Sequence, residues 1–288
     1  MVIIRSFCRA MRVAVVGLAI LAAISISAPG QEQPCDVAHV LGKKIAARDV
    51  LNKGVQAFRK ARYDDAICYF QSATRLDPGL VIAKMYLGTA MAETVVPGLE
   101  TPENLKIAQQ AIDIFQEVLD KKPHDINTIK QIAALDYSIK RFEEAKGWQK
   151  KVLEEDPKDP EAAYTIGAID WMEAHMNMLE ELTPAGLTDD GEGNANAPAE
   201  VMEKIKAKNS VLVEEGIQYL NRAVSIRPNY DDAMVYMNLI YRCKASVDWG
   251  NETERAADVA AAAEWVRKAI DVRKELEKRK SGEVSEKP

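Results

Sequence analysis

Residue patterns typical of enzymes and metalloproteins are scarce in this sequence. Its 288 residues include only three histidines, His39, His124 and His175, and none has a partner at the spacing of metal ligands. It has no glycine-rich phosphate loop, no serine in a nucleophile elbow and no His-Glu zinc signature. The Met-His run from Trp171 to Met178 is a weak copper(I) pattern, because methionine-rich helix faces usually serve packing. We therefore expect no cofactor, no metal site and no enzymatic activity.

Strand patterns are also missing. No long segment alternates apolar and polar residues with β-branched enrichment, and aromatic residues make up only 6% of the chain. Ala, Glu, Lys, Ile and Leu recur instead, and these residues favour helices. The apolar fraction of 47% is sufficient for a core. The composition thus predicts an all-α protein.

The N-terminal segment has the pattern of a secretory signal peptide. Three arginines precede an apolar run from Val13 to Ile26, and small residues follow up to Ala28. The run is shorter than the ~20 residues that span a bilayer. We expect cleavage after residues 1–28 and a periplasmic or secreted protein. The alternative is an uncleaved anchor, in which residues 13–26 hold the protein in the inner membrane.

Charge and cysteine content narrow the choice of partners. Loss of residues 1–28 removes three positive charges and no acid, so the net charge moves from −6 to −9. An acidic exported protein is a poor candidate for nucleic acid or an anionic membrane surface, and we expect membrane contact only from an uncleaved N-terminus. Cys35, Cys68 and Cys243 remain after cleavage, an odd number. Either Cys35 and Cys68 form a disulfide near the first repeat, or the cysteines are buried and unpaired.

An internal repeat is the main organising signal. The interval from Ala111 to Ala145 equals the interval from Pro123 to Pro157. This period resembles that of the tetratricopeptide repeat (TPR), a pair of antiparallel helices in about 34 residues. The matching positions are a small residue in the first helix (Gly54, Gly88, Ala133, Gly167), a small residue in the second (Ala66, Ala111, Ala145, Gly216) and a proline after it (Pro78, Pro123, Pro157, Pro228). A fifth unit departs from the pattern, with Asn238 and Lys274 at the first and last positions.

The pattern has a physical basis, because two helices approach closely only where both contribute small side chains. We expect each Gly or Ala of a first helix to face the small residue of the second, with proline ending the unit. The resemblance implies a right-handed TPR α-solenoid of about five helix pairs, with inserted loops and lengthened second helices. The expected segments are the lead-in 29–46, the units 47–80, 81–125, 126–159, 160–230 and 231–275, and a charged tail 276–288.

Three units are longer than the regular repeat. The extra residues fall between the two helices of a unit, near Pro97–Glu100, in the Gly-, Asn- and acid-rich segment 183–199 and near Val247–Asn251. We expect 183–199 to be a flexible loop and all three insertions to lie along one edge of the solenoid. Either they form a binding surface, or they are tolerated loop growth.

The resemblance also implies a concave groove lined by the first helices, where TPR proteins bind other polypeptides. Candidate groove residues are Phe58, Met85, Lys130, Tyr137, Tyr164 and Trp171. The carboxylate clamp of co-chaperone TPR proteins is missing, because Lys130 stands alone and Ala134 occupies the expected Asn position. We expect a non-enzymatic scaffold of the cell envelope with a protein or peptide partner. The alternative is a membrane-anchored structural spacer whose insertions carry recognition.

Overall fold

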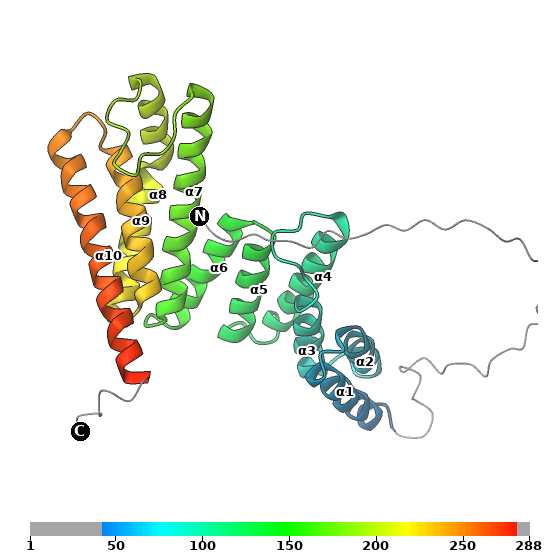
Figure 1. Ribbon diagram of the computed structural model, residues 1–288. Helices are drawn as coiled ribbons and strands as arrows, with labels where there is room; N and C mark the ends of the chain where they lie inside the picture. The colour runs from blue at the N-terminus through cyan, green and yellow to red at the C-terminus, as the bar shows by residue number, and fades with distance from the viewer. Residues whose placement is uncertain (1–41, 281–288) are drawn as a thin grey trace, which may run out of the picture.

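The chain folds into helical hairpins that stack side by side (Figure 1). The computed structural model describes residues 42–280, and no strand occurs within that range. The helices are α1 (Lys43–Arg59), α2 (Tyr63–Leu76), α3 (Val81–Ala92), α4 (Pro102–Leu119), α5 (Ile126–Ser138), α6 (Phe142–Glu155), α7 (Pro160–Leu182), α8 (Ala199–Ile226), α9 (Asp231–Val247) and α10 (Glu252–Lys280), with a 3₁₀ turn η1 (Thr183–Ala185). They form five successive pairs, so the expected right-handed, all-α solenoid is confirmed.

Local sequence signals set many of the helix ends. Thr101 caps α4 and Asp125 caps α5, each by accepting a hydrogen bond from a backbone N–H of the first turn. Asp159 caps α7 and is followed by Pro160, whose fixed φ suits the first helical position. In units 1 and 3 the short turn between the paired helices passes through the left-handed conformation at Ala61 (φ 53°) and Lys140 (φ 62°).

The packing of the small residues differs in one respect from our expectation. Gly54 lies against the ring of Phe70, and a Cβ atom at Gly54 would come within 2.5 Å of Phe70 Cε1. Gly88 is covered in the same way by Phe115. In both units the glycine of the first helix therefore contacts a phenylalanine of the second helix. This phenylalanine follows the small residue of the second helix by four positions. Only such a glycine leaves room for a buried ring at this crossing.

In unit 4 an aliphatic side chain takes the place of the ring. A Cβ atom at Gly167 would come within 2.5 Å of Leu220 Cγ and 2.9 Å of the Gly216 carbonyl oxygen. Unit 3 has alanines at both small positions, and Ala133 and Ala145 are both buried. All these positions, as well as Ala66 and Ala111, thus belong to the closely packed interior of their pairs.

Lengthened helices absorb most of the additional residues. The second helices α4, α8 and α10 have 18, 28 and 29 residues, against 14 in α2 and α6. The first helices of units 4 and 5 are also long, with 23 residues in α7 and 17 in α9, which the repeat pattern does not predict. α7 to α10 therefore stand as tall neighbouring columns at one end of the molecule (Figure 1). Within the described residues, the helices extend from Lys43 to Lys280, slightly beyond the expected solenoid limits on both sides.

The inserted connections fold forward onto the next unit. In the α3–α4 connection, the Gly98 N–H donates to the Ser138 carbonyl at 2.8 Å and Glu100 forms an ion pair with Lys140 at 3.1 Å. The α7–α8 connection was expected to be a flexible loop. Instead it is bound to unit 5, because its backbone carbonyls accept hydrogen bonds from Arg242, Trp249 and Arg255. Its Gly193 also approaches the Ala245 carbonyl too closely for a side chain.

Several sequence predictions lie wholly or partly outside the described residues. The signal peptide, Cys35 and the end of the expected tail, residues 281–288, belong to this group. Cys68 is disulfide-bonded, whereas Cys243 is a buried free thiol. Within residues 42–280, no helix has both the length and the apolar character that crossing a membrane requires.

Candidate peptide-binding groove

The first helices α5, α7 and α9 bring aromatic side chains together. Trp171 of α7 stacks on His175, with ring centroids 5.5 Å apart and an interplanar angle of 14°. The edge of Tyr236, from α9, meets Trp171 at 5.2 Å and Tyr164 at 5.4 Å. Tyr164 also contacts Tyr230, at 5.1 Å. We refer to Tyr164, Trp171, His175, Tyr230 and Tyr236 as the aromatic wall.

Tyr137 of α5 lies on the same side as the aromatic wall. Burial raises the pKa of its hydroxyl, and the nearby hydroxyl of Tyr236 raises that pKa further. Tyr137 and Tyr236 thus interact electrostatically, although a complete unit separates α5 from α9 in sequence. Tyr137 is also 41% exposed and packs edge-on against Phe142 at 5.7 Å. Tyr137 is thus an exposed aromatic side chain, whereas the rings of the aromatic wall pack against one another.

Burial raises the pKa of two tyrosines of the aromatic wall, Tyr164 and Tyr230. Burial raises the pKa of Tyr164, with further increases from Tyr236, Tyr230 and Asp232. Burial also raises the pKa of Tyr230 to about 12, against the opposing effect of Arg227. These hydroxyls remain neutral at physiological pH. The wall therefore offers ring faces and neutral hydroxyls, which suit peptide contacts better than proton transfer.

The other three candidate residues are not part of this surface. Phe58 packs edge-on against Tyr63 at 5.4 Å within unit 1, beside the core. Met85 is half-buried on α3. Lys130 forms an ion pair with Asp159, the capping residue of α7, so its charge serves the joint between units 3 and 4. Of the candidate residues, Tyr164 and Trp171 thus belong to the aromatic wall and Tyr137 interacts electrostatically with its member Tyr236, whereas Phe58, Met85 and Lys130 have other partners or lie on other units.

Sequence reasoning missed Tyr236 and His175. When Asn238 of unit 5 is aligned with Gly167 of unit 4, Val235 rather than Tyr236 falls at the position equivalent to Tyr164. The contact of Tyr236 with α7 forms between units and has no local sequence signal. His175 follows Trp171 by four residues, a spacing that puts both on one helix face. The lengthened part of α7 also exposes Met176 (46%) and Leu179 (39%).

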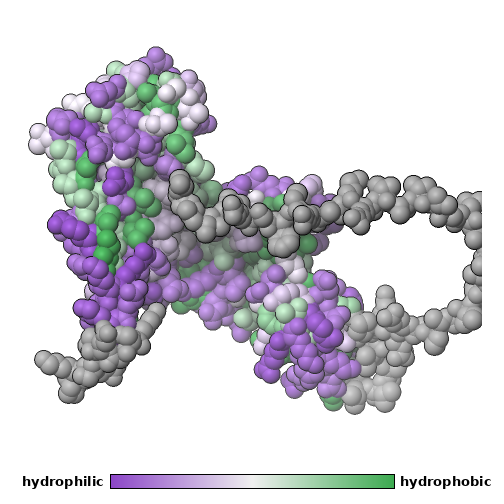
Figure 2. Space-filling view, in the orientation of Figure 1, coloured by the Kyte–Doolittle hydropathy of each residue, from purple (hydrophilic) through white to green (hydrophobic). Residues whose placement is uncertain are grey.

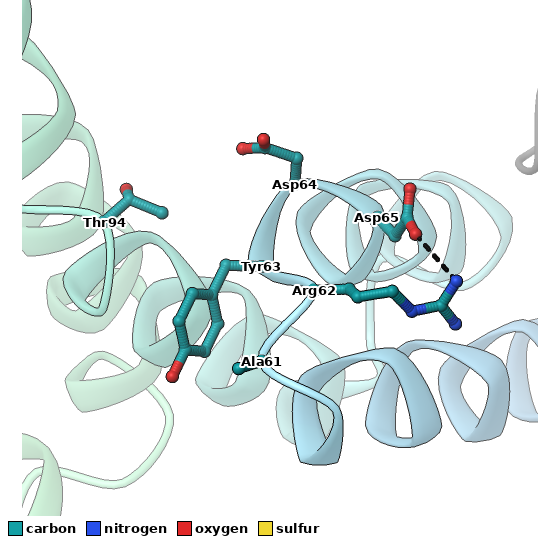
Figure 3. Close-up of a pocket in the computed structure, with 6 residues that line it drawn as sticks. All are labelled: Ala61, Arg62, Tyr63, Asp64, Asp65 and Thr94. Carbon is teal, nitrogen blue, oxygen red and sulfur yellow. Dashed lines mark ion pairs between the residues drawn. The ribbon is translucent and has the colours of Figure 1, made fainter.

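Besides the aromatic wall, the described residues form a shallow pocket and contrasting surface areas on the α9–α10 pair (Figure 2). Ala61, Arg62, Tyr63, Asp64, Asp65 and Thr94 line a shallow pocket beside the α1–α2 turn (Figure 3). Arg62 pairs with Asp65 at 3.2 Å, and this pair points away from Thr94 (Figure 3). The lower part of α10 presents a hydrophilic surface, while apolar areas appear higher on the α9–α10 pair (Figure 2). Within the described residues, no group of three or more His, Cys, Asp or Glu side chains is placed to hold a metal ion.

Stacked antiparallel helix pairs with first helices on a common inner side define the class of α-solenoid proteins. The sequence model of the tetratricopeptide repeat matches residues 108–169. The fold is similar to "MamA 41-end from Desulfovibrio magneticus RS-1", with a TM-score of 0.53, 17% identity and coverage of 80% of this chain and 96% of that one. It is also similar to "Crystal structure of MamA protein", with a TM-score of 0.53, 14% identity and coverage of 84% and 98%.

No curated protein sequence matches the chain. The repeat model at residues 108–169 and the fold of the described residues together support assignment to the tetratricopeptide-repeat family, without a named subfamily. At such low identity the solved structures establish the fold and nothing narrower. Proteins with this fold are in general non-catalytic scaffolds for protein–protein interaction, and their partners are proteins or peptides.

Proposed function

We propose that the protein is a non-enzymatic scaffold of the cell envelope that binds a peptide segment of a partner protein along α5, α7 and α9. The observation that carries the proposal is the contact between Trp171 of α7 and Tyr236 of α9, together with the exposed Tyr137 of α5, which interacts electrostatically with Tyr236. Tyrosine and tryptophan provide large contact areas with few rotatable bonds, and they are frequent hot spots of protein interfaces.

The contacts within the aromatic wall favour binding over a purely structural role for Tyr137. Trp171 is held from two directions by His175 and Tyr236, so this platform exists before a partner arrives. A preformed platform loses little side-chain entropy on binding. Tyr137 remains 41% exposed beside it, and the exposed Met176 extends the apolar surface along α7. A peptide laid across α5 and α7 would bury these side chains together.

The inserted connections provide a second candidate surface. Val96 and Leu99 of the α3–α4 connection are 52% and 43% exposed, which is unusual for apolar side chains in a short loop. The α7–α8 connection uses several of its carbonyls to bind unit 5, which suits a bracket between units better than a free recognition loop. Val96 and Leu99 therefore represent the alternative, in which the protein is an anchored spacer with recognition on its insertions.

The proposed location rests on the N-terminal sequence and on cysteine chemistry. Residues 1–28 have the charge and apolar pattern of a cleaved signal. Cys68 is disulfide-bonded, and structural disulfides persist mainly in oxidising compartments. N-terminal sequencing of the protein isolated from an envelope or secreted fraction tests this point. A mature N-terminus near Ala28 supports export, whereas an intact N-terminus supports the membrane-anchored spacer.

Binding is tested by capture of partners from an envelope fraction, followed by mass spectrometry and quantification of the captured protein with variants. We expect Tyr137→Ala with Trp171→Ala to weaken capture about tenfold or more, at ~1–2 kcal/mol for each hot spot. Val211→Ala, at a 75% exposed position of α8, is the matched control and should bind as the wild type does. Circular dichroism of each variant confirms that the helices remain folded.

The same assay distinguishes the two surfaces. If Val96→Ser with Leu99→Ser abolishes capture while the aromatic variant still binds, recognition lies on the insertion and the groove proposal is wrong. If neither double variant changes capture, the partner binds elsewhere on the solenoid and both surfaces are excluded.

A further inference from the structure

A lysine surrounded by carboxylates lies inside the joint between units 3 and 4. Lys146 of α6 is only 4% exposed, and its Nζ lies 2.5 Å from Asp170 Oδ1 of α7. Glu215 of α8, Glu143 of α6 and Glu173 of α7 approach the same Nζ at 3.2, 3.3 and 3.8 Å. Side chains from three helices thus meet at one buried ammonium group. We refer to these five residues together with Lys150, which pairs with Glu215 at 2.6 Å, as the joint cluster.

The joint cluster replaces apolar packing found elsewhere in the solenoid. Lys146 follows the small residue Ala145, and the equivalent positions in units 1, 2 and 4 hold isoleucine (Ile67, Ile112 and Ile217). Asp170 is completely buried, and the charged group that its carboxylate contacts is the ammonium of Lys146. Burial of a charged carboxylate removes it from water, and this desolvation is energetically costly even when an ammonium group pairs with it. An isoleucine at position 146, as at the equivalent positions of the other units, would have provided close packing without a buried charge.

The charges of the joint cluster do not balance when all groups are ionised. Lys146 and Lys150 contribute two positive charges, whereas Glu143, Asp170, Glu173 and Glu215 contribute four negative charges. Glu143 is 72% exposed and Lys150 is 42% exposed, so solvent screens them. Asp170 and Glu173 are the inner members, at 0% and 19% exposure. Protonation of these two carboxylates leaves two positive and two negative charges.

The titration of the inner carboxylates agrees with this geometry. Burial raises the pKa of Asp170 to about 6, although Lys146 lowers it. Burial raises the pKa of Glu173 to about 7, again against Lys146. Burial lowers the pKa of Lys146, but Asp170, Glu215 and Glu143 outweigh this effect and raise it overall, so the lysine stays charged. The pKa of Glu215 is lowered overall, because Lys150 and Lys146 outweigh its burial.

We propose that the contact between units 3 and 4 is a proton-sensitive joint, in which proton uptake by Asp170 and Glu173 tightens the packing of α6 against α7 and α8. A carboxyl group whose pKa is higher in the folded state stabilises that state at low pH and loses this contribution as the pH rises through the folded pKa. The joint is therefore tighter near pH 5.5 than near pH 8. This joint lies between unit 3, which carries Tyr137, and units 4 and 5, which carry the aromatic wall.

Hydrogen exchange of the full chain tests the joint directly. Protection factors, corrected for the intrinsic rate at each pH, are compared at pH 5.5 and 8 for residues 142–155 and 160–175, with α2 as internal reference. We expect protection in these two segments to fall about tenfold at pH 8, which is equivalent to one pKa unit of linkage. Protection in α2 should stay constant. Equal protection of α6 and α7 at both pH values contradicts the proposal.

A variant assigns the effect to the inner carboxylates. Asp170→Asn with Glu173→Gln removes both proton sites and should abolish the difference between the two pH values. Glu154→Gln with Glu203→Gln, at exposed positions of α6 and α8, is the control and should retain it. If the double variant does not fold, Glu173→Gln alone, at the outer of the two positions, should roughly halve the pH effect. Persistence of the full effect in either variant overturns the proposal.

Discussion

Asp136 and Asp170 occupy the same position of successive repeats, and both are buried in their units. Their partners differ. Asp136 lies 3.9 Å from Arg141, a residue of its own unit, whereas Asp170 depends on Lys146 of the preceding unit. One repeat position thus serves internal stability in unit 3 and contact between units in unit 4. Substitution of Asp136 should therefore affect unit 3 itself, whereas substitution of Asp170 should affect the contact between units 3 and 4.

The first prediction concerns the pH dependence that Asp136 contributes. Burial raises its pKa to about 6, against the effect of Arg141. Its contribution to stability is therefore present at low pH and is lost as the pH rises through the folded pKa. Asp136→Asn should reduce the difference in urea midpoint between pH 5 and pH 8. A variant with the complete wild-type pH dependence contradicts the assignment.

The second prediction tests the contact between Gly54 and Phe70. Phe70 is completely buried, so its ring has no room to move away from an added methyl group. Gly54→Ala should destabilise the protein by ~1–3 kcal/mol through overpacking. Gly147 of α6 has no atom near its Cβ position, so Gly147→Ala is the matched control and should stabilise the protein by up to ~1 kcal/mol. Urea unfolding measures both effects, and equal outcomes for the two variants argue against the contact.

The third prediction concerns the small residues of unit 3. Ala145 is completely buried, and we expect Ala145→Leu to destabilise by ~1–3 kcal/mol, the range of overpacked cores. Ala134 is exposed on α5, so Ala134→Leu should change the unfolding midpoint little. An unchanged midpoint for Ala145→Leu indicates that the repeat alignment is shifted in unit 3.

The fourth prediction concerns the α3–α4 connection, which Asn104 holds from within. Its amide accepts from the Val96 N–H at 2.8 Å and donates to the carbonyls of Val96 and Leu99 at 3.0 and 2.7 Å. Asn104→Ala leaves these groups without a partner and should destabilise by ~1–3 kcal/mol. Hydrogen exchange should increase mainly in residues 93–101. Gln110→Ala, at an exposed position of the same helix, should leave that segment protected.

The fifth prediction concerns the cysteines. We expect non-reducing peptide mapping of the mature protein to recover a peptide that links Cys35 to Cys68. Burial raises the pKa of the Cys243 thiol to about 12, so it should react with iodoacetamide only after unfolding. A map in which Cys243 takes part in the linkage contradicts both statements.

The repeat units could be predicted from the sequence because their signals are local. Proline ends a helix wherever it falls in the interior, and Asp159 before Pro160 caps the next one without help from distant residues. The regular spacing from Ala111 to Ala145 is equally independent of long-range contacts. The aromatic wall could be anticipated only in part, since Tyr164 and Trp171 lie at regular repeat positions, whereas the contact of Tyr236 with them forms between units.

The sequence by itself therefore determined the helix pairs and the small residues at their crossings, because turn chemistry and close packing act over a few residues. Tertiary structure decided which side chains meet across units. The twist between successive pairs places Lys146 of α6 against Asp170 of α7 and Glu215 of α8. It also lets carbonyls of the α7–α8 connection meet Arg242 and Arg255 of unit 5. Such contacts join residues from different units, and their geometry exists only once the units have stacked.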